Sequence, residues 1–352
     1  MKRTLCALAV LSLVAAGPAP QPYSAAQDGD VVHLRDARSQ TVVSIVPSVG
    51  NVAFGMTVRG ANVLRFPYAS VEEFRSAPRL SGIPLLAPWA NRLDELGFFA
   101  NGRHYAFNPD LGNVRGPRPI HGLVASARQW QVVEIESDAT AAWVTSRLEF
   151  YREPAWMAQF PFAHSIDMTY RLRDGTLEVA TVVANLSSDP MPVSIGYHPY
   201  FQLTDSTREA WTIAVGARTE WLLSPDKLPT GELRPITGLF PDPTRIALKD
   251  FDLDHVFGDL ERDGSGRATM TVRGRSQQLD VLVGPKYRAM VVYAPAPRPG
   301  QPASNQNFIC FEPMAAITNA LNLAHRGVYK ELQSIPPRGT WQESFWIRPS
   351  GF

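Results

Sequence analysis

The chain has 352 residues, of which 45% are hydrophobic and 19% are charged, a composition typical of globular proteins and not of disordered chains. Thirty-four basic residues stand against 33 acidic ones. No basic block is present, so the sequence lacks the electrostatic signature of a protein that binds nucleic acid. These numbers favour a small, neutral or weakly charged molecule as the partner.

The N-terminus has the three-part pattern of a secretory signal peptide. Two basic residues precede an apolar run over residues 5–16, and small residues at 24–26 suit cleavage before Gln27. A membrane anchor is the alternative, but the run is too short to span about 30 Å of hydrocarbon. We therefore predict a signal peptide over residues 1–26, and an exported protein, periplasmic or secreted, with no membrane anchor after cleavage.

Removal of that segment leaves a single cysteine, Cys310. One thiol cannot form an intramolecular disulfide, so the mature fold must be stabilised by burial. No second Cys or His stands near it at metal-ligand spacing. We therefore expect Cys310 to be a small buried apolar residue.

Short segments of alternating apolar and polar residues dominate the rest of the chain. The alternation over residues 164–172 predicts a strand with one covered face. A turn at residues 174–176 and a second run complete a predicted hairpin over residues 164–186. Further strand-like runs lie at residues 211–217, 268–274, 278–284 and 289–295.

Helical signals are few. The segment that begins at Ser70 has Glu73 three residues further on, the spacing of a capping box, and predicts one short helix. Neither a βαβ alternation nor an internal repeat is visible. The pattern predicts an all-β fold, a large antiparallel β-sandwich with long loops and few short helices, forming a single domain over residues 27–352.

Five segments place polar or ionisable residues among apolar and turn residues. These residues are Asn91 and Arg92 in GIPLLAPWANRL, His121 in PIHGLV, His198 in GYHPYF, Asp254 in FDLDHVF and Glu312 in FICFEPM. The structural alternatives are a surface arginine, a turn or core histidine and a turn-capping aspartate. Glu312 is the strongest signal. It alternates with Phe308 and Cys310 on one strand face, and a glutamate is rarely buried unless it is paired or functional.

Together these groups suit a sugar. Arginine donors and aspartate acceptors match hydroxyl groups, and Trp89, Trp156 and Tyr200 either offer apolar faces to a sugar ring or belong to the core. A carboxylate and an imidazole can remove the anomeric proton and protonate the ring oxygen, and each transfer is worth about 10²–10⁴-fold. Ring opening and reclosure by this route exchange the α and β anomers, and need neither a cofactor nor a metal.

These segments make the chain similar to the aldose 1-epimerase (galactose mutarotase) family. The similarity rests on ANR at 90–92, HG at 121–122, GYHPYF at 196–201, DLDHVF at 252–257 and FEPM…TNALN at 311–322. The segments occur in the family's order and cover most of the mature chain. The resemblance implies a galactose mutarotase-like fold, often described as a supersandwich, and a monosaccharide substrate, a hexose or a related aldose.

The resemblance also implies a role for each side chain. Glu312 would be the general base that takes the anomeric proton, and His198 the general acid at the ring oxygen. His121 would stabilise the charge that develops there. The residues that would bind the sugar hydroxyls are Arg92 and Asp254, with Asn91 lining the same pocket.

Other functions remain open at this point. A carbohydrate-binding protein of the same fold would have no reason to keep both an acid and a base. A glycosidase would use Glu312 and Asp254 at a suitable separation. A hexose-phosphate epimerase-like enzyme, whose branch GIPLLAPWANRL and HGLV also resemble, would need cationic residues beyond Arg92. Export favours a free aldose as the substrate, because phosphorylated sugars are mainly cytoplasmic metabolites. A metal site on His121 and His198 lacks clustered ligand spacing.

Overall fold

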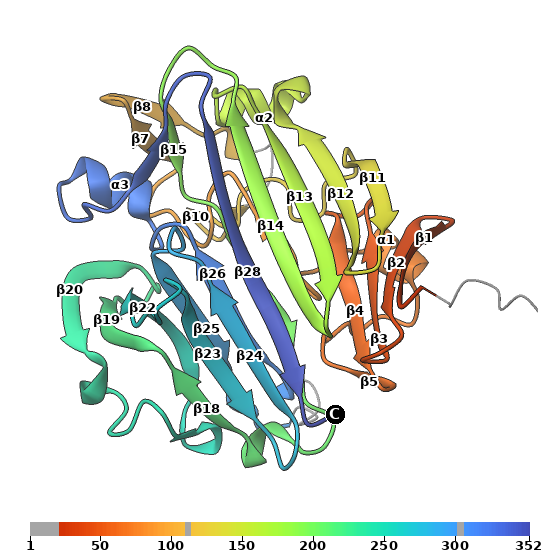
Figure 1. The fold of residues 1–352 in the computed structure, drawn as a ribbon. Coiled ribbons are helices and arrows are strands. Elements are labelled where there is room, and N and C mark those ends of the chain that lie inside the picture. The colour runs from red at the N-terminus through yellow and green to blue at the C-terminus, as the bar shows by residue number, and fades with distance from the viewer. Residues whose placement is uncertain (1–20, 110–113, 301–305) are drawn as a thin grey trace, which may run out of the picture.

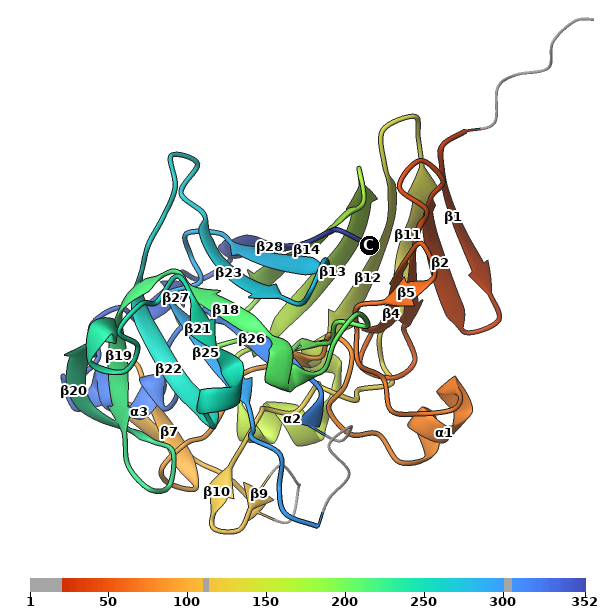
Figure 2. The same ribbon diagram turned by 90° about the horizontal axis from the view of Figure 1, so that it is seen from below.

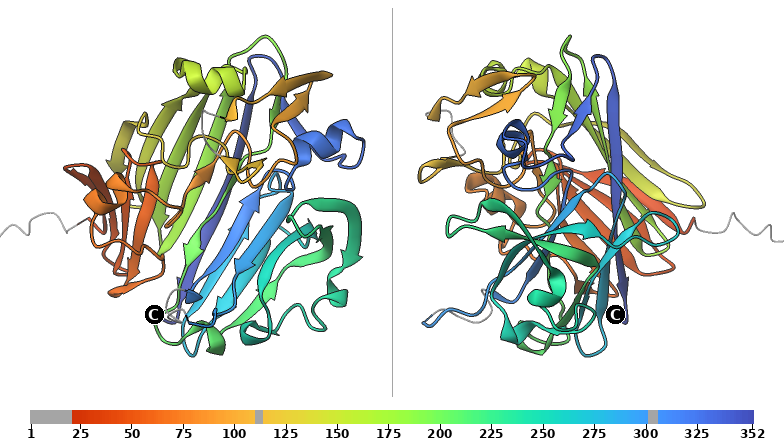
Figure 3. Two further views of the ribbon diagram at one scale, coloured as in Figure 1. Left: turned by 180° about the vertical axis from the view of Figure 1, so that it is seen from behind. Right: turned by 90° about the vertical axis from the view of Figure 1, so that its left-hand side faces the viewer.

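The computed structural model describes residues 21–109, 114–300 and 306–352. Its first sheet is antiparallel and runs in chain order, with each strand paired to the next (Figure 1). Its strands are β1 (Tyr23–Asp28), β2 (Val31–Asp36), β3 (Thr41–Val46), β4 (Val52–Val58) and β5 (Ala61–Asn62). This sheet packs against the yellow and green strands of a larger sheet (Figure 3).

The larger sheet has nine antiparallel strands, and the last strand of the chain lies at its centre. In spatial order the strands are β11 (Gln131–Ser137), β12 (Ala142–Glu149), β13 (His164–Arg173), β14 (Thr176–Asn185), β28 (Thr340–Ser350), β24 (Gln278–Val283), β23 (Ala268–Arg273), β18 (Thr212–Val215) and β21 (Ile246–Ala247). The predicted hairpin over residues 164–186 is confirmed, with Arg173 paired to Thr176 across the turn.

An eight-stranded antiparallel sheet forms the opposite layer (Figure 2). In spatial order its strands are β20 (Pro229–Pro235), β19 (Ala217–Leu223), β22 (Leu253–Leu260), β25 (Ala289–Ala294), β26 (Ile309–Met314), β16 (Gly196–Tyr197) and β6 (Leu85–Leu86), with β17 (Tyr200–Phe201) also paired to β26. The predicted all-β antiparallel sandwich is therefore confirmed.

The core lies between these layers. Along β13, every second side chain from His164 to Leu172 is buried, as the sequence alternation predicts. Tyr197 of β16 spans the layers: its ring lies 4.9 Å from that of Phe345, and its hydroxyl lies 2.5 Å from the Thr181 hydroxyl. The loops that carry the candidate site are therefore attached to a packed, close-fitting scaffold.

The remaining elements are short. The two-stranded ribbons pair β7 (Gly97–Ala100) with β8 (Arg103–Ala106), β9 (Val114–Arg115) with β10 (Arg118–Pro119), and β15 (Met191–Val193) with β27 (Gln333–Ile335). The α-helices are α1 (Val71–Ser76), α2 (Pro154–Gln159) and α3 (Ala320–His325), and the 3₁₀ turns are η2 (Phe150–Arg152), η3 (Arg208–Ala210), η4 (Ile236–Gly238) and η5 (Leu248–Asp250). Within the described ranges, no helix is long and apolar enough to cross a bilayer.

The capping box predicted at Ser70 is present at the start of α1. The Ser70 hydroxyl accepts a hydrogen bond from the Glu73 amide at 3.1 Å, and the Glu73 carboxylate accepts one from the Ala69 amide at 2.7 Å. These bonds satisfy amides that a helix start leaves without an intrahelical partner.

The predicted signal-peptide boundary falls inside β1. Cleavage before Gln27 would remove four of the six residues of this strand. Among these four, the Tyr23 side chain is buried, and its hydroxyl donates a hydrogen bond to Asp174 Oδ1 at 3.0 Å. Residues 1–20 of the predicted signal peptide lie outside the described residues.

Candidate active site

A cavity of about 760 Å³ contains, in its wall, every side chain that the sequence singled out for chemistry. These are Asn91, Arg92, His121, His198, Asp254 and Glu312. They come from two strands and three loop segments that are far apart in sequence, so only the fold brings them together.

Two of the acidic side chains stand on neighbouring parts of one sheet face. Asp254 of β22 pairs with Tyr293 of β25, which pairs in turn with Cys310 of β26. Glu312 lies two residues beyond Cys310, and side chains two residues apart on a strand point to the same face. The eight-stranded sheet thus presents Asp254, Tyr293 and Glu312 to the cavity.

His198 is held at the end of a short strand segment by backbone bonds on both sides. Its amide donates to the Pro84 carbonyl at 3.1 Å, and the Tyr200 amide donates to the Gly82 carbonyl at 2.8 Å. Pro199 between them has no amide to donate, so the ladder can be interrupted there without an unsatisfied donor. The imidazole stacks on the Tyr200 ring, with the ring centroids 4.8 Å apart, and this contact fixes its plane.

Glu312 and His198 form the central pair of the site. His198 Nε2 lies 3.3 Å from Glu312 Oε1, and both side chains are almost completely buried. Within the described part of the chain, no hydrogen-bond partner reaches the other polar atom of either side chain, His198 Nδ1 or Glu312 Oε2. A buried polar atom without a partner is costly. These two atoms are therefore available to a ligand.

His121 comes to the cavity on a loop that folds against the Asn91 loop. The His121 amide donates to the Asn91 carbonyl at 2.9 Å, and the Leu123 amide donates to the Ala87 carbonyl at 2.7 Å. Gly122 has a φ of +62°, and a Cβ atom there would lie 2.1 Å from the Ala87 oxygen. Only glycine permits this close approach, so the His-Gly pair in the sequence has a steric reason.

The two histidines lie edge to face, with their ring centroids 5.5 Å apart. Burial lowers the pKa of His121 well below its ordinary value, and the nearby His198, Arg92 and Arg115 act in the same direction. No partner within the described ranges reaches His121 Nδ1. His121 is thus a neutral imidazole beside His198, able to exchange a hydrogen bond with a ligand.

The proton affinities of the central pair are inverted relative to water. Burial lowers the pKa of His198 to about 3, and the charges of Arg92 and Arg115 act in the same direction. Burial raises the pKa of Glu312 well above its ordinary value, with Asp254 adding to the rise and Arg92 opposing it. The carboxyl therefore holds a proton more tightly than the imidazole does, whereas in water the order is reversed.

Basic residues that the sequence did not single out also line the cavity. They are Arg79, Arg115, Lys227 and Arg298. Arg115 stands six residues before His121 in the Gly/Pro-rich turn VRGPRPIHG, and that proximity was the available signal. Arg298 lies in a proline-rich loop that resembles an ordinary surface connection, and nothing in its local sequence indicates a place at the site.

Of the three aromatic residues considered for stacking on a sugar, one lines the cavity. Tyr200 does so, and Tyr293, which the sequence did not indicate, joins it. Trp89 belongs to the core, where it stacks on Phe107 at 4.7 Å, and Trp156 packs on Phe150. Their structural role is ordinary, because large aromatic side chains dominate protein cores.

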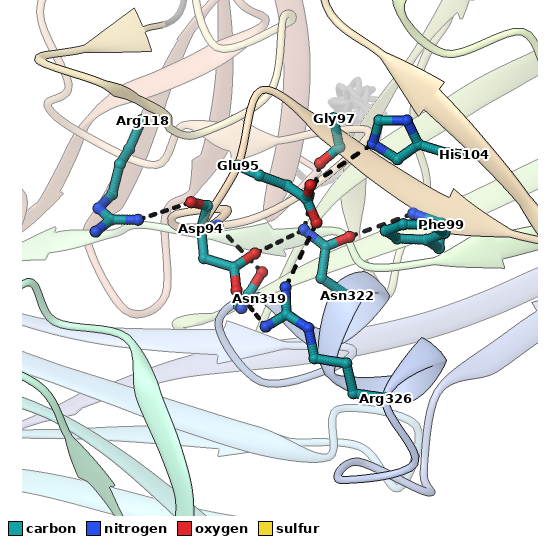
Figure 4. A network of polar contacts seen from close by, with 9 residues as sticks. All are labelled: Asp94, Glu95, Gly97, Phe99, His104, Arg118, Asn319, Asn322 and Arg326. Atoms are coloured by element: carbon teal, nitrogen blue, oxygen red, sulfur yellow. Dashed lines mark hydrogen bonds and ion pairs between the residues drawn. The ribbon is translucent and has the colours of Figure 1, made fainter.

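A polar network outside the cavity ties the Asn91 loop to the segment after Glu312 (Figure 4). Asn322 donates to the Asp94 carboxylate at 2.8 Å and accepts from the Phe99 amide at 3.2 Å. The Asp94 carboxylate also accepts from Arg326, and these bonds outweigh the effect of burial and lower the pKa of Asp94. Asp94 is thus a fixed anchor two residues from Arg92.

Solved structures share this fold. A galactose mutarotase-like protein from Clostridium acetobutylicum aligns with a TM-score of 0.80 at 21% sequence identity, over 92% of this chain and 95% of that one. Galactose 1-epimerase from Lactobacillus acidophilus NCFM aligns with a TM-score of 0.72 at 15% identity, over 93% and 98% of the two chains. At these identities the likeness establishes a galactose mutarotase-like fold.

The sequence itself shows the family. Residues 56–347 match the family model described as aldose 1-epimerase. The chain therefore belongs to the aldose 1-epimerase family, a family whose substrates are sugars. The uncharacterized protein YphB from Escherichia coli (strain K12) is 28% identical over 123 residues, which are 35% of this chain and 38% of that protein. The match thus spans well under half of the length of that curated relative.

Proposed function

We propose that the protein is an isomerase, an aldose 1-epimerase or mutarotase that interconverts the α and β anomers of an aldose. The observation that carries the proposal is the buried pair of Glu312 and His198, 3.3 Å apart at a cavity wall, with one polar atom of each free for a ligand. Anomer exchange needs a base at the anomeric hydroxyl and an acid at the ring oxygen, which are both bonded to C1. This pair supplies the base and the acid.

The proposed reaction begins with the cyclic hemiacetal. The Glu312 carboxylate takes the proton of the anomeric hydroxyl, and the O–H electrons form the carbonyl at C1. The bond between C1 and the ring oxygen breaks, and that oxygen receives a proton from the imidazolium of His198. The reactive form of the pair is therefore the minor one, in which Glu312 is ionised and His198 is protonated. Rotation about C1–C2 and reclosure with both transfers reversed give the other anomer, so protons and electrons balance over the cycle.

The remaining side chains of the cavity would hold the sugar while the ring opens. Arg92 and Asp254 offer donors and acceptors of the kind that hydroxyl groups use. Arg92 is itself oriented by a 3.2 Å hydrogen bond to the Asn91 side chain. His121 would stabilise the charge that develops at the ring oxygen, because a hydrogen bond in a water-poor site is stronger than in water.

Polarimetry tests the proposal. Freshly dissolved α-glucose and α-galactose should reach equilibrium faster with the protein than spontaneously. Glu312→Gln and His198→Asn should each lower the accelerated rate about 10²–10⁴-fold, because each removes one proton transfer. Because burial lowers the pKa of His198 and raises that of Glu312, the form with an ionised carboxyl and a protonated imidazole is most populated between the two pKa values. The rate should therefore fall as the pH rises above the pKa of Glu312.

Matched variants separate chemistry from folding. Glu220 is as buried as Glu312 but lies on the other side of the sheet in an ion pair, and His104 is a half-exposed histidine far from the cavity. Glu220→Gln and His104→Asn should keep the full rate per folded molecule. Retained activity in Glu312→Gln or His198→Asn would overturn the assigned roles. No acceleration with any common aldose would favour a binding protein, and release of reducing ends from an oligosaccharide would favour a glycosidase.

We also propose that the protein is exported to the periplasm or the medium. The support is the basic, apolar and small-residue pattern of residues 1–26. An exported mutarotase would act on sugars before they enter the cell.

A further inference from the structure

The candidate cavity carries a strong local charge although the chain as a whole is nearly neutral. Five cationic side chains line its described wall, against two carboxyls. The cations are Arg79, Arg92, Arg115, Lys227 and Arg298, and the carboxyls are Asp254 and Glu312. The burial of Glu312 and the resulting rise in its pKa reduce the negative charge further. A cleft lined by one sign of charge attracts ligands of the opposite sign.

Most of these cations are not neutralised by the protein. Lys227 lies 3.8 Å from the Asp254 carboxylate and is the exception. For Arg79, Arg92, Arg115 and Arg298, no carboxylate of the described chain lies within 4.0 Å. By contrast, Arg118, on the same ribbon as Arg115, already pairs with Asp226 at 2.6 Å. Four cations of the cavity wall therefore have no carboxylate partner within the described chain.

Arg92, which is half-buried, and Arg115, which is exposed, form the part of this set that lies nearest the two histidines. Both line the cavity, and both line a second hollow of about 200 Å³ that adjoins it. Both lie close enough to His121 and His198 to lower the pKa of each imidazole. Two guanidinium groups beside the same two rings repel each other unless an anion lies between them. Arginine also binds carboxylate and phosphate with two parallel hydrogen bonds, which neutral hydroxyls cannot match.

Two of the cations, Arg115 and Arg298, lie on the same side of the site. Arg115 stands at the end of β9, and Arg298 follows β25; β9, β10 and the segment after β25 project from the same side of the molecule (Figure 2). Arg79, Arg115 and Arg298 are exposed, so all three can attract an anion from solution. Arg115 can then bind it together with the half-buried Arg92.

We propose that the sugar which this protein prefers carries an oxyanion, a carboxylate or a phosphate, and that Arg92 and Arg115 bind it. The inference rests on the proposed mutarotase function and narrows its substrate class. The catalytic pair would act on the anomeric carbon and the ring oxygen, while the oxyanion would occupy the Arg92–Arg115 side of the cavity. The sequence alone identified Arg92 as the single cation at the site; the fold adds four more.

The test compares four sugars on one protein, in two pairs of an anionic sugar and its neutral counterpart. Rates of anomer exchange above the spontaneous rate are measured for galactose, for galacturonic acid and for glucose 6-phosphate with glucose as its neutral counterpart. We expect kcat/KM to be about tenfold or more higher for at least one anionic sugar than for its neutral counterpart, the size expected for charge-assisted hydrogen bonds. A preference for galacturonic acid or for the sugar phosphate then identifies which oxyanion is bound.

Two arginine variants test whether Arg115 causes the preference for anionic sugars. Arg115→Gln should reduce the ratio of anionic to neutral kcat/KM about tenfold, whereas Arg118→Gln, on the same ribbon, should leave the ratio unchanged because Asp226 already neutralises that side chain. Raising the ionic strength should increase KM for the anionic sugar more than for the neutral one.

The outcomes separate this inference from the proposed function. Equal or faster turnover of the neutral sugars overturns the anionic substrate but leaves the mutarotase intact. Acceleration of none of the sugars overturns the mutarotase itself. An unchanged ratio in Arg115→Gln overturns the assignment of the oxyanion to this arginine pair.

Discussion

At the scale of single residues, two glutamates show how the surroundings of a buried carboxyl decide its use. Glu220 receives hydrogen bonds from Arg234 and His255, and these bonds outweigh burial and lower its pKa. Within the described residues, the one ion-pair contact of Glu312 is with His198, and burial raises the pKa of Glu312. A carboxyl that is stabilised as an anion supports the fold, whereas one left uncompensated is suited to bind and release a proton.

Substitution of Glu312 and of Glu220 by glutamine should change the stability of the fold in opposite directions. Glu312→Gln should raise the unfolding temperature at pH 7, because it removes a group that the fold holds in an unfavourable environment. Glu220→Gln should lower the free energy of unfolding by about 1–3 kcal/mol, the worth of hydrogen bonds to a charged group. Thermal unfolding of both variants beside the parent chain measures the two effects.

The stability contributions of Glu312 and Glu220 should depend on pH in different ways. The raised pKa of Glu312 means that its cost is absent below the unfolded value of 4.5, grows as the pH rises above 4.5 and is complete once the pH passes the folded value. The lowered pKa of Glu220 means that its contribution is present above 4.5 and is lost as the pH falls through the folded value. Both variants should therefore converge on the parent chain in acid. A Glu312→Gln variant that is less stable than the parent at pH 7 would contradict this account.

At the scale of elements, the site depends on loops that pack against one another. The Gly122 backbone lies against Ala87, and this contact places His121 in the cavity. Gly122→Ala should force the two loops apart and lower kcat about 10²-fold, the effect of displacing a catalytic group by about 1 Å. The rate per folded molecule, measured by polarimetry, checks this.

Gly102 is the matched control for Gly122. It too has a positive φ, +72°, but a Cβ atom there would meet nothing within 4 Å. Gly102→Ala should therefore cost only the strain of a left-handed alanine, about 1–2 kcal/mol, and should keep kcat. If both alanine variants lose activity equally, backbone strain and not the contact with Ala87 explains the loss.

At the scale of the whole molecule, the N-terminal strand links export to stability. The signal-peptide pattern predicts a mature chain that starts at Gln27, yet Tyr23 is buried and bonded to Asp174 on the β13–β14 turn. A chain that starts at Gln27 should unfold at a lower temperature than one that starts at residue 21, because it loses the Tyr23 packing and part of β1. Thermal unfolding of the two truncated chains measures this difference.

Cell fractionation and mass spectrometry of the full-length product complete that test. Export should give a shortened chain in the periplasm or the medium, and its mass locates the cut relative to Tyr23 and Gln27. A full-length chain that stays in the cytoplasm would contradict export. Equal unfolding temperatures of the two truncated chains would show that β1 adds nothing to the stability of the fold.

The sequence by itself determined the fold class and the central residues of the site. Alternation with a period of two follows directly from strand geometry, so the hairpin over residues 164–186 could be predicted. Glu312 could be singled out because a charged residue on an apolar strand face has few structural explanations. The motifs around His121 and His198 added the family resemblance that the family match confirmed.

Only the tertiary structure decided which residues surround that centre. Lys227 and Arg298 lie in loops whose local sequence resembles any exposed connection, because the side chains they approach are far away along the chain. Trp89 and Trp156 are of the residue type that stacks on sugar rings, but both pack on phenylalanine side chains of the protein. The direction of an aromatic side chain depends on neighbours that local periodicity does not encode. The charge of the cavity is likewise the sum of side chains from distant segments. It therefore cannot be predicted from the net charge of the chain or from any single motif.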